Sequence, residues 1–207
     1  MGWKTNLIVI EGVVQDRHQL LKALGYDGAS IQRQSTCETM FPSKGLVIGD
    51  YAGCTLVAEP RLPTKILDHP AGVEARRLLA QFPDRRILVC VLHSVVNLAG
   101  FSLFNKGELQ RSFAVSSDDG IFINVGQGLS EEQQMLARYE QVTDDQGEVN
   151  YRDTDGEVYT LDQLGEEIVF EVVAGLTGKR PDFDDALFEA TADVYRKHSW
   201  LASIFRR

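Results

Sequence analysis

The chain has 207 residues, of which 43% are hydrophobic and 25% are charged, and these ordinary globular proportions argue against a fibrous, low-complexity or largely disordered protein. Its formal net charge is −9, and the segment from Glu140 to Glu171 carries eleven Asp or Glu against the single Arg152. Such a surface repels phosphate backbones, and no apolar run approaches the roughly 18 residues of a membrane span, so we expect neither nucleic acid nor membrane as a partner.

The first 82 residues predict strands with two helices between them. Asp16 is placed to cap the first helix, and Gly25 is its expected end. Pro60 and Pro63 are expected to end the strands before them, and Pro70 to start a second helix that runs to about residue 82. The predicted strands are residues 5–11, a weaker run at 31–36, and a hairpin formed by 45–48 and 54–58.

The stretch 85–126 is expected to hold the core of the fold. Residues 87–92 form an unbroken apolar run, which is typical of an internal strand buried on both faces. We expect Val89 and Val91 on one face and Leu88, Cys90 and Leu92 on the other. Strands at 98–105 and 108–116 flank the turn 105–107, and a strand at 121–125 follows the turn 116–120, so these consecutive strands predict a meander.

The last third alternates helix and hairpin signals. Ser130 is expected to cap a helix to about residue 139, and a hairpin over 148–152 and 157–160 follows. Thr160 and Gln163 form a capping box that opens the best helix of the sequence, and Gly178 ends it. A last helix is predicted from Asp184, because one helical face would carry Leu187, Phe188, Thr191, Val194 and Tyr195. We expect the apolar tail at 199–207 to contact the body of the protein or a partner.

These elements predict one α+β domain over residues 1–207, with a mixed, largely antiparallel sheet built on the central meander and helices packed on it. We find no internal repeat, low-complexity tract or linker that would force a domain boundary. Residues 129–207 could form an acidic hairpin-plus-helices subdomain within it.

One candidate catalytic site lies at the end of the core strand. His93 would act as a base, Ser94 or Ser116 as the nucleophile, and Asp118 or Asp119 as the orienting carboxylate. However, neighbouring residues of a strand point to opposite faces, and no G-x-S-x-G elbow is present. A histidine with a structural hydrogen bond is therefore the favoured interpretation.

The sequence supports no cofactor or metal site. Asp153, Asp155 and Gly156 match part of a calcium-binding loop, but Tyr151 and Asp162 fall where that loop needs its first and last ligands, so a plain hairpin turn is favoured. The remaining histidines lack zinc spacing, and no dinucleotide or phosphate-binding glycine motif occurs. The three cysteines, Cys37, Cys54 and Cys90, are expected to be buried free thiols.

Three short motifs carry a resemblance to a known family: a His-Ser-Val-Val strand end, a Gly-x-Leu-x-Arg-Ser hairpin, and the helix opening Leu-Gly-Glu-Glu. These three motifs are residues 93–96, 107–112 and 164–167. Two further features of the family accompany them: Lys4-Thr5 before the first strand, and Gly120-Ile121 with residues 124–126. With these motifs the chain resembles a family of small bacterial cytoplasmic proteins of unknown function. The resemblance implies a bacterial, single-domain protein and no mechanism.

The most informative functional signal is the concentrated acidity. It predicts a non-enzymatic cytoplasmic binding or accessory protein that meets a basic protein partner through Asp144, Asp145, Glu148, Asp153 and Asp155. The alternative is a hydrolase-like enzyme around His93. A third interpretation, a solvated hairpin that serves solubility only, needs no partner.

Overall fold

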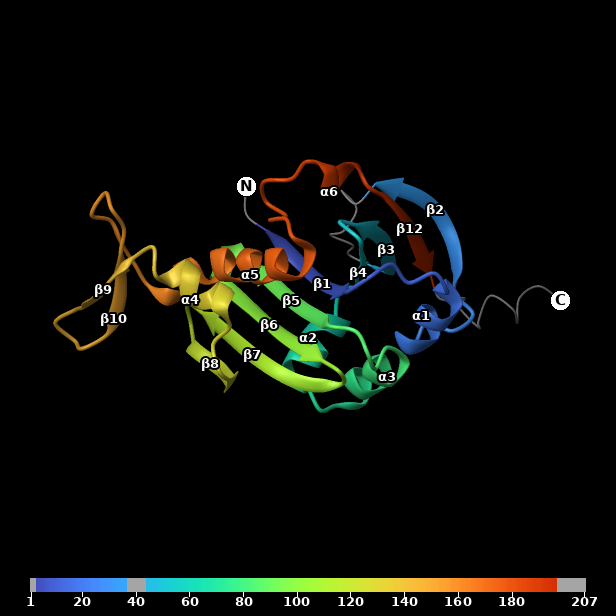
Figure 1. Ribbon diagram of the computed structural model, residues 1–207, viewed down its shortest axis with the longest axis horizontal. Helices are drawn as coiled ribbons and strands as arrows, with labels where there is room; N and C mark the ends of the chain where they lie inside the picture. Colours follow the sequence, from blue (N-terminus) through green and yellow to red (C-terminus); the bar gives the residue numbers. More distant parts are fainter. Residues whose placement is uncertain (1–2, 37–43, 197–207) are drawn as a thin grey trace.

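The structure, a computed structural model, describes residues 3–36 and 44–196 (Figure 1). Its centre is a nine-stranded antiparallel sheet with helices on both faces, which confirms the predicted α+β class with a largely antiparallel sheet. In spatial order the strands are β2 (Ser30–Thr36), β12 (Thr191–Arg196), β3 (Leu46–Tyr51), β4 (Cys54–Ala58), β1 (Lys4–Ile10), β5 (Ile87–His93), β6 (Leu98–Asn105), β7 (Glu108–Ser116) and β8 (Gly120–Gly126). No helix among the described residues is long and apolar enough to cross a membrane.

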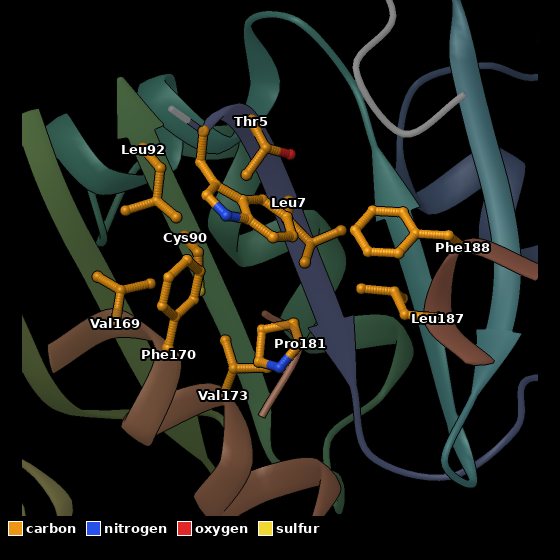
Figure 2. Close-up of a pocket in the computed structure, with 11 residues that line it drawn as sticks. Thr5, Leu7, Cys90, Leu92, Val169, Phe170, Val173, Pro181, Leu187 and Phe188 are labelled. Carbon is orange, nitrogen blue, oxygen red and sulfur yellow. The ribbon is translucent and has the colours of Figure 1, made fainter. Parts of the chain in front are cut away.

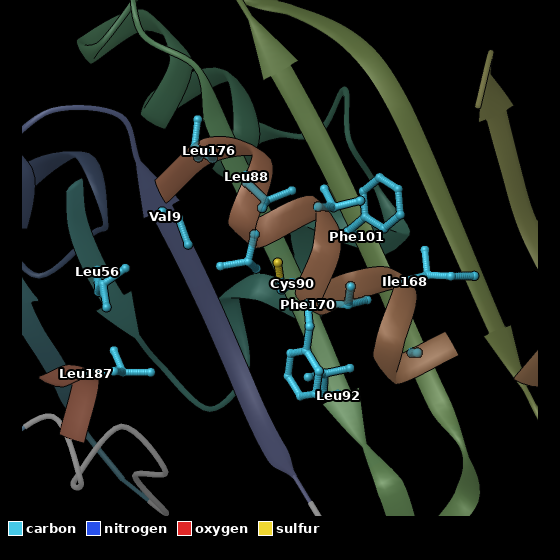
Figure 3. Close-up of a cluster of buried hydrophobic side chains, with 14 of the residues drawn as sticks. Val9, Leu56, Leu88, Cys90, Leu92, Phe101, Ile168, Phe170, Leu176 and Leu187 are labelled. Carbon is cyan, nitrogen blue, oxygen red and sulfur yellow. The ribbon is translucent and has the colours of Figure 1, made fainter. Parts of the chain in front are cut away.

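The predicted core strand, β5, is internal. It pairs along its whole length with β1 on one side and β6 on the other. Leu88, Cys90 and Leu92 belong to the apolar cluster of one face (Figure 3). Val89 belongs to the large cluster of the other face, and Val91 belongs to a smaller cluster with Leu67, so the predicted division is confirmed. The meander after it is also confirmed, because β5, β6, β7 and β8 pair in sequence order.

Helices cover both faces of the sheet. On one face lie α1 (Arg17–Ala23), α2 (Leu62–Asp68) and α3 (Val73–Gln81), and on the other α4 (Ser130–Leu136), α5 (Leu161–Thr177) and the short α6 (Ala186–Glu189). The capping predictions for two of them are confirmed. The Asp16 side chain accepts from the Gln19 N–H, and the Thr160 N–H donates to Gln163 Oε1 at 2.9 Å.

Gly165 sets the distance between α5 and the sheet. A Cβ at this position would lie 2.8 Å from Ala99 Cβ and 3.0 Å from Val115 Cγ1. The first distance is shorter than real Cβ atoms show, and the second is tighter than most real Cβ contacts, so a glycine lets the helix approach β6 and β7 without displacing either side chain. The acidic side chains that follow on α5 are positioned by this contact.

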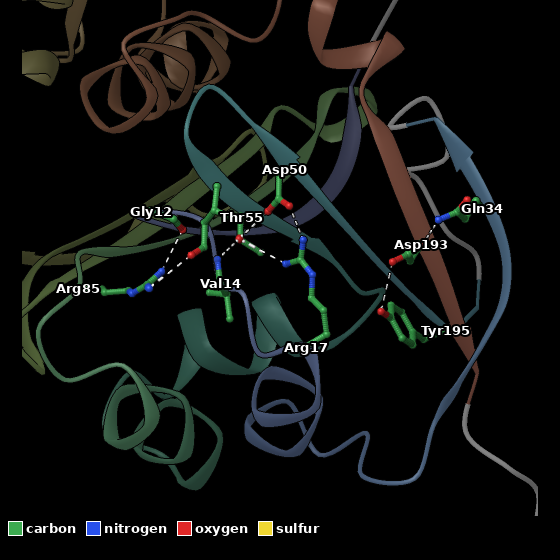
Figure 4. Close-up of polar contacts among 10 residues, drawn as sticks. Gly12, Val14, Arg17, Gln34, Asp50, Thr55, Arg85, Asp193 and Tyr195 are labelled. Carbon is green, nitrogen blue, oxygen red and sulfur yellow. Dashed lines mark hydrogen bonds and ion pairs between the residues drawn. The ribbon is translucent and has the colours of Figure 1, made fainter.

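Buried polar contacts fix the chain between β1 and α1 (Figure 4). Thr55 is fully buried, and its hydroxyl accepts from the Val14 N–H at 2.8 Å and donates to Asp50 Oδ1 at 2.7 Å. Arg17 of α1 also pairs with Asp50. Arg85 donates to the Gly12 carbonyl at 3.0 Å, so the connection is tied both to β4 and to the start of β5. These contacts satisfy polar groups inside the fold.

The C-terminal helix prediction is wrong. Only α6 is helical, and residues 191–196 form β12, which pairs with β3 and β2. Ala192 and Val194 are buried at strand spacing, and the adjacent edges of β2 and β3 supply backbone partners that a local helical pattern cannot indicate.

Smaller differences concern helix starts. Pro63 lies in the first turn of α2 instead of ending a strand. Proline is tolerated there because the backbone N–H that it lacks would have no partner within the helix at this position. The next helix begins at Val73 rather than Pro70, and Leu129 rather than Ser130 is the cap of α4, which ends at Leu136. The predicted tail at 199–207 and Cys37 lie outside the described residues.

A second, three-stranded sheet projects from the main body at one end (Figure 1). It consists of β9 (Glu140–Thr143), β10 (Val149–Arg152) and β11 (Val158–Tyr159), and we call residues 140–160 the acidic arm. The hairpin between β10 and β11 was predicted, whereas β9 was not. At its base Tyr151 is buried, and the Tyr139 and Tyr159 rings meet edge to face at 5.9 Å, so the arm is anchored by aromatic contacts.

Candidate functional site

The two turns of the acidic arm are copies of each other. The sequence Asp-x-x-Gly-Glu-Val occurs at Asp144 and again nine residues later at Asp153, a short repeat that forces no domain boundary. In each copy the Asp Oδ1 accepts two backbone N–H groups at 2.9 Å, those of Gln146 and Glu148 or those of Asp155 and Glu157. The turn aspartates therefore shape the arm.

The second carboxylate oxygen of each turn aspartate also has a partner. Asp144 Oδ2 accepts from Asn150 Nδ2 at 3.1 Å, and Asp153 Oδ2 accepts from the Tyr159 hydroxyl at 3.1 Å. Hydrogen bonds from the backbone, that of Glu148 first, lower the pKa of Asp144 and keep it ionised. Within the described residues no group of three His, Cys, Asp or Glu could hold a metal ion, and the Asp153 turn is a hairpin turn as expected.

The other three residues of the predicted acidic face are Asp145, Glu148 and Asp155, and their side chains are exposed at the turns. Two of the five predicted binding residues thus form the turns, and three present carboxylates to solvent. The repeat could have indicated these two roles. An aspartate at the start of a turn commonly accepts hydrogen bonds from backbone N–H groups a few residues later, and Asp144 and Asp153 both begin a copy of the repeat.

The acidity extends well beyond the arm. Residues 107–178, which we call the acidic half, hold sixteen Asp or Glu and three Arg, so they carry −13 while the rest of the chain carries +4. Each of these arginines is already in an ion pair: Arg111 with Glu132 at 2.9 Å, Arg138 with Glu171 at 2.8 Å and Arg152 with Glu140 at 3.3 Å. No arginine or lysine of this described range is left unpaired.

Arg111 and Glu132 are a structural pair that sequence reasoning missed. Their side chains are only 6% and 8% exposed. The guanidinium donates to both Glu132 oxygens, to Asn124 Oδ1 at 2.6 Å and to the Val125 and Gly126 carbonyls, while Glu132 Oε2 accepts the Leu129 N–H. The motifs that suggested a family at residues 107–112 and 124–126 thus meet in one network that joins β7, β8 and α4.

The predicted catalytic residues at the end of β5 take separate positions. Because side chains alternate along β5, His93 lies on the same face of the sheet as Val91, near Leu98. Ser94 lies on the other face, which α5 covers. Ser94 Oγ accepts the Trp3 N–H at 2.6 Å and makes a short hydrogen bond with Glu166. Ser116 Oγ accepts the Asp119 N–H at 3.1 Å, and Asp118 lies in the same turn. Among the described residues no hydrogen bond joins His93 to any of these groups.

A polar recess opens beside Ser94, with a volume of about 210 Å³. Asn97, held at a φ of 46°, donates to Asp162 Oδ2 at 2.9 Å. The recess lies where the strand-end motif and the helix-opening motif meet, and its lining includes Ser94, Asn97, Asp162, Gln163, Glu166 and Glu167. Its carboxylates belong to the acidic half, and none of the described residues that line it is basic, although Glu167 also pairs with Arg180.

An apolar crevice lies on the same face, between the N-terminal end of β1 and α5 (Figure 2). The Trp3 ring meets Phe170 at 5.2 Å and Phe188 at 5.9 Å. Its volume is about 30 Å³, which is room for roughly one water molecule. This crevice is part of the core rather than a ligand site.

The described cysteines are buried free thiols, as predicted. Burial raises the pKa of Cys54 and of Cys90, so both remain protonated and neither is a nucleophile at neutral pH.

Comparison with models of protein families matches residues 25–184 to a family described as a family of unknown function (DUF6928). The matched range contains the meander, the acidic arm and all of α5. Comparison with curated proteins and with solved structures gives no match.

Proposed function

The chain belongs to this family of unknown function, DUF6928, and we propose that it is a non-enzymatic binding or accessory protein of the bacterial cytoplasm whose acidic half binds a basic protein. The observation that carries the proposal is the one-sided charge, −13 over residues 107–178 with every arginine there paired internally. Apart from these three arginines and Arg180, which pairs with Glu167 and Glu171, the carboxylates of this range have no ion-pair partner among the described residues and could bind a partner's lysines and arginines.

The acidic arm is the part best placed for first contact. It projects from the body (Figure 1). Its two turns expose Asp145, Glu148 and Asp155. The turn aspartates hold these loops in one shape, so little conformational entropy is lost when a partner binds. Exposed charge pairs mainly steer association, and their effect should fall steeply with salt.

A capture experiment from cytoplasmic extract tests the proposal. The binding variant is D145N/E148Q/D155N, which removes three exposed charges and leaves both turn aspartates in place. The matched control is D27N/D68N/D84N, which removes three exposed charges outside the acidic half. We expect basic proteins on wild type and control at low salt, at least tenfold less on the binding variant, and release at about 0.5 M salt.

Equal capture by the two triple variants, or capture that resists salt, would contradict an electrostatic function. If wild type, the control and the binding variant all capture no basic protein, the arm would have a role in solubility alone, and the proposal would also be defeated.

A further inference from the structure

One edge of the main sheet lacks the usual protection. β8 is the last strand in the spatial order, and within the described residues no strand pairs with its outer side. Its sequence from Gly120 to Gly126 has no charged residue and no proline, and Ile121, Phe122 and Val125 are 48%, 45% and 51% exposed. Natural edge strands are normally blunted by charge, proline or cover, because unpaired backbone groups recruit further strands.

The opposite edge is different. β2 reads Ser-Ile-Gln-Arg-Gln-Ser-Thr, so Ile31, which is 52% exposed, is its one exposed large apolar side chain and stands among polar side chains and Arg33. The two edges therefore differ in degree: β8 exposes three large apolar side chains and has no charged residue, whereas β2 exposes one and carries Arg33.

β8 is held rigidly at its C-terminal end. Arg111 donates to the side chain of Asn124 and to the carbonyls of Val125 and Gly126, and this guanidinium is itself locked by Glu132. The strand is regular from Ile123 to Gly126, whereas a register shift near Phe122 leaves that residue without a paired neighbour. A rigid edge lowers the entropic cost of adding a strand.

Charge indicates which strand would bind. Asp118 and Asp119 precede β8 directly, Gln127 and Gly128 follow it, and the strand lies within the acidic half. A second copy would bring another acidic half to the same edge, so charge disfavours it. A basic segment running antiparallel to β8 would place its C-terminal residues next to Asp118 and Asp119.

We propose that the partner contributes an extended segment that adds to β8 as a tenth, antiparallel strand along residues 123–126, with Lys or Arg at its C-terminal end and β-branched side chains beside Val125. The backbone hydrogen bonds provide affinity, and the charged end fixes direction. This inference rests on the proposed function and names the form of its partner.

The test uses a short synthetic peptide of alternating Thr and Val with two C-terminal Lys, and the same peptide with alternate backbone amides N-methylated. Affinity is measured by fluorescence anisotropy, and amide hydrogen exchange is followed in the full chain. We expect the first peptide to slow exchange in residues 123–126 at least tenfold, and the methylated peptide to bind about tenfold more weakly, since about two hydrogen bonds are lost.

Two variants locate the site. V125K places a charge on an exposed edge position and should abolish binding of the peptide without affecting the fold, while D118N/D119N should weaken it and reduce the preference for C-terminal over N-terminal Lys. The arm variant D145N/E148Q/D155N reports on the proposed function separately, because it leaves β8 unchanged.

Equal binding of the plain and methylated peptides, no binding of either, or exchange protection confined to the acidic arm would overturn strand addition while leaving the capture result to stand by itself. Protection of the same amides by self-association, without peptide, would assign the edge to a second copy and would also overturn the inference.

Discussion

At the scale of single residues, the Arg111–Glu132 pair should dominate stability at the β8 end of the molecule. Both side chains are almost fully buried, and each of the three guanidinium nitrogens donates at least one hydrogen bond. Arg111→Met leaves the Glu132 carboxylate buried and unpaired, and we expect it to lower the free energy of unfolding by about 3–5 kcal/mol in urea titrations.

The double variant R111M/E132Q provides the control. Because it removes both charges and retains an acceptor for the Leu129 N–H, it should be more stable than R111M alone by at least about 1 kcal/mol. A double variant less stable than R111M would show that the pair acts by something other than charge compensation.

Asp144 should make the arm sensitive to acid. Its pKa in the folded protein lies below its ordinary value of about 3.9, because the Glu148 backbone and other donors hold the ionised form. The turn's stabilisation is therefore complete above about pH 4 and is lost as the pH falls through the lower folded pKa. An NMR titration should show the Gln146 and Glu148 amide signals moving below pH 4. The same shifts in Asp144→Asn would argue against this origin.

At the scale of elements, the contact of α5 with the sheet should depend on Gly165. Gly165→Ala gains up to about 1 kcal/mol of helix propensity, but its methyl group meets Ala99 and Val115, and overpacking of this kind costs about 1–3 kcal/mol. We expect net destabilisation in thermal and urea unfolding. The displacement of α5 by this methyl group should also widen the polar recess beside Ser94.

Gly175 is the matched control on the same helix. The three atoms nearest to a methyl group there all belong to the side chain of Glu131, which can move away because Gly175 is exposed. Gly175→Ala should therefore be neutral or slightly stabilising. Equal losses in both variants would show that close packing against β6 and β7 is not the reason for Gly165.

Most elements were predictable because their signals are local. The caps at Asp16 and Thr160 and the apolar run of β5 identify their elements without reference to the rest of the chain. β12 was misread because Leu187, Val194 and Tyr195 also fit a helix, and its real partners lie about 150 residues away. The Arg111 network was missed for the same reason, since its members come from β7, β8 and α4.

The candidate site was predictable in charge but not in shape. Composition indicated the acidic segment, yet only the hydrogen bonds separate Asp144 and Asp153, which form turns, from Asp145, Glu148 and Asp155, which face solvent. His93 and Ser94 are neighbours in sequence, and the alternation of a strand is what separates them in space.

At the scale of the whole molecule, the sheet should require its last strand. β12 lies between β2 and β3, and β3 is buried almost throughout. A chain ending at Ala190 exposes the edge of β3, and we expect aggregation or loss of cooperative unfolding. A chain ending at Arg196 retains all nine strands and should stay soluble and unfold cooperatively. Equal behaviour of the two chains in size-exclusion chromatography and calorimetry would contradict this role of β12.

The position of β12 also has a consequence for how the chain folds during synthesis. Thr36 pairs with Thr191, so β2 and β3 leave the ribosome about 150 residues before the strand that joins them. Pairings this distant in sequence form slowly, because a long loop must close first. The nascent chain therefore holds an incomplete sheet with an open apolar edge until β12 emerges, and we expect chaperones that bind exposed apolar strands to associate with it in that interval.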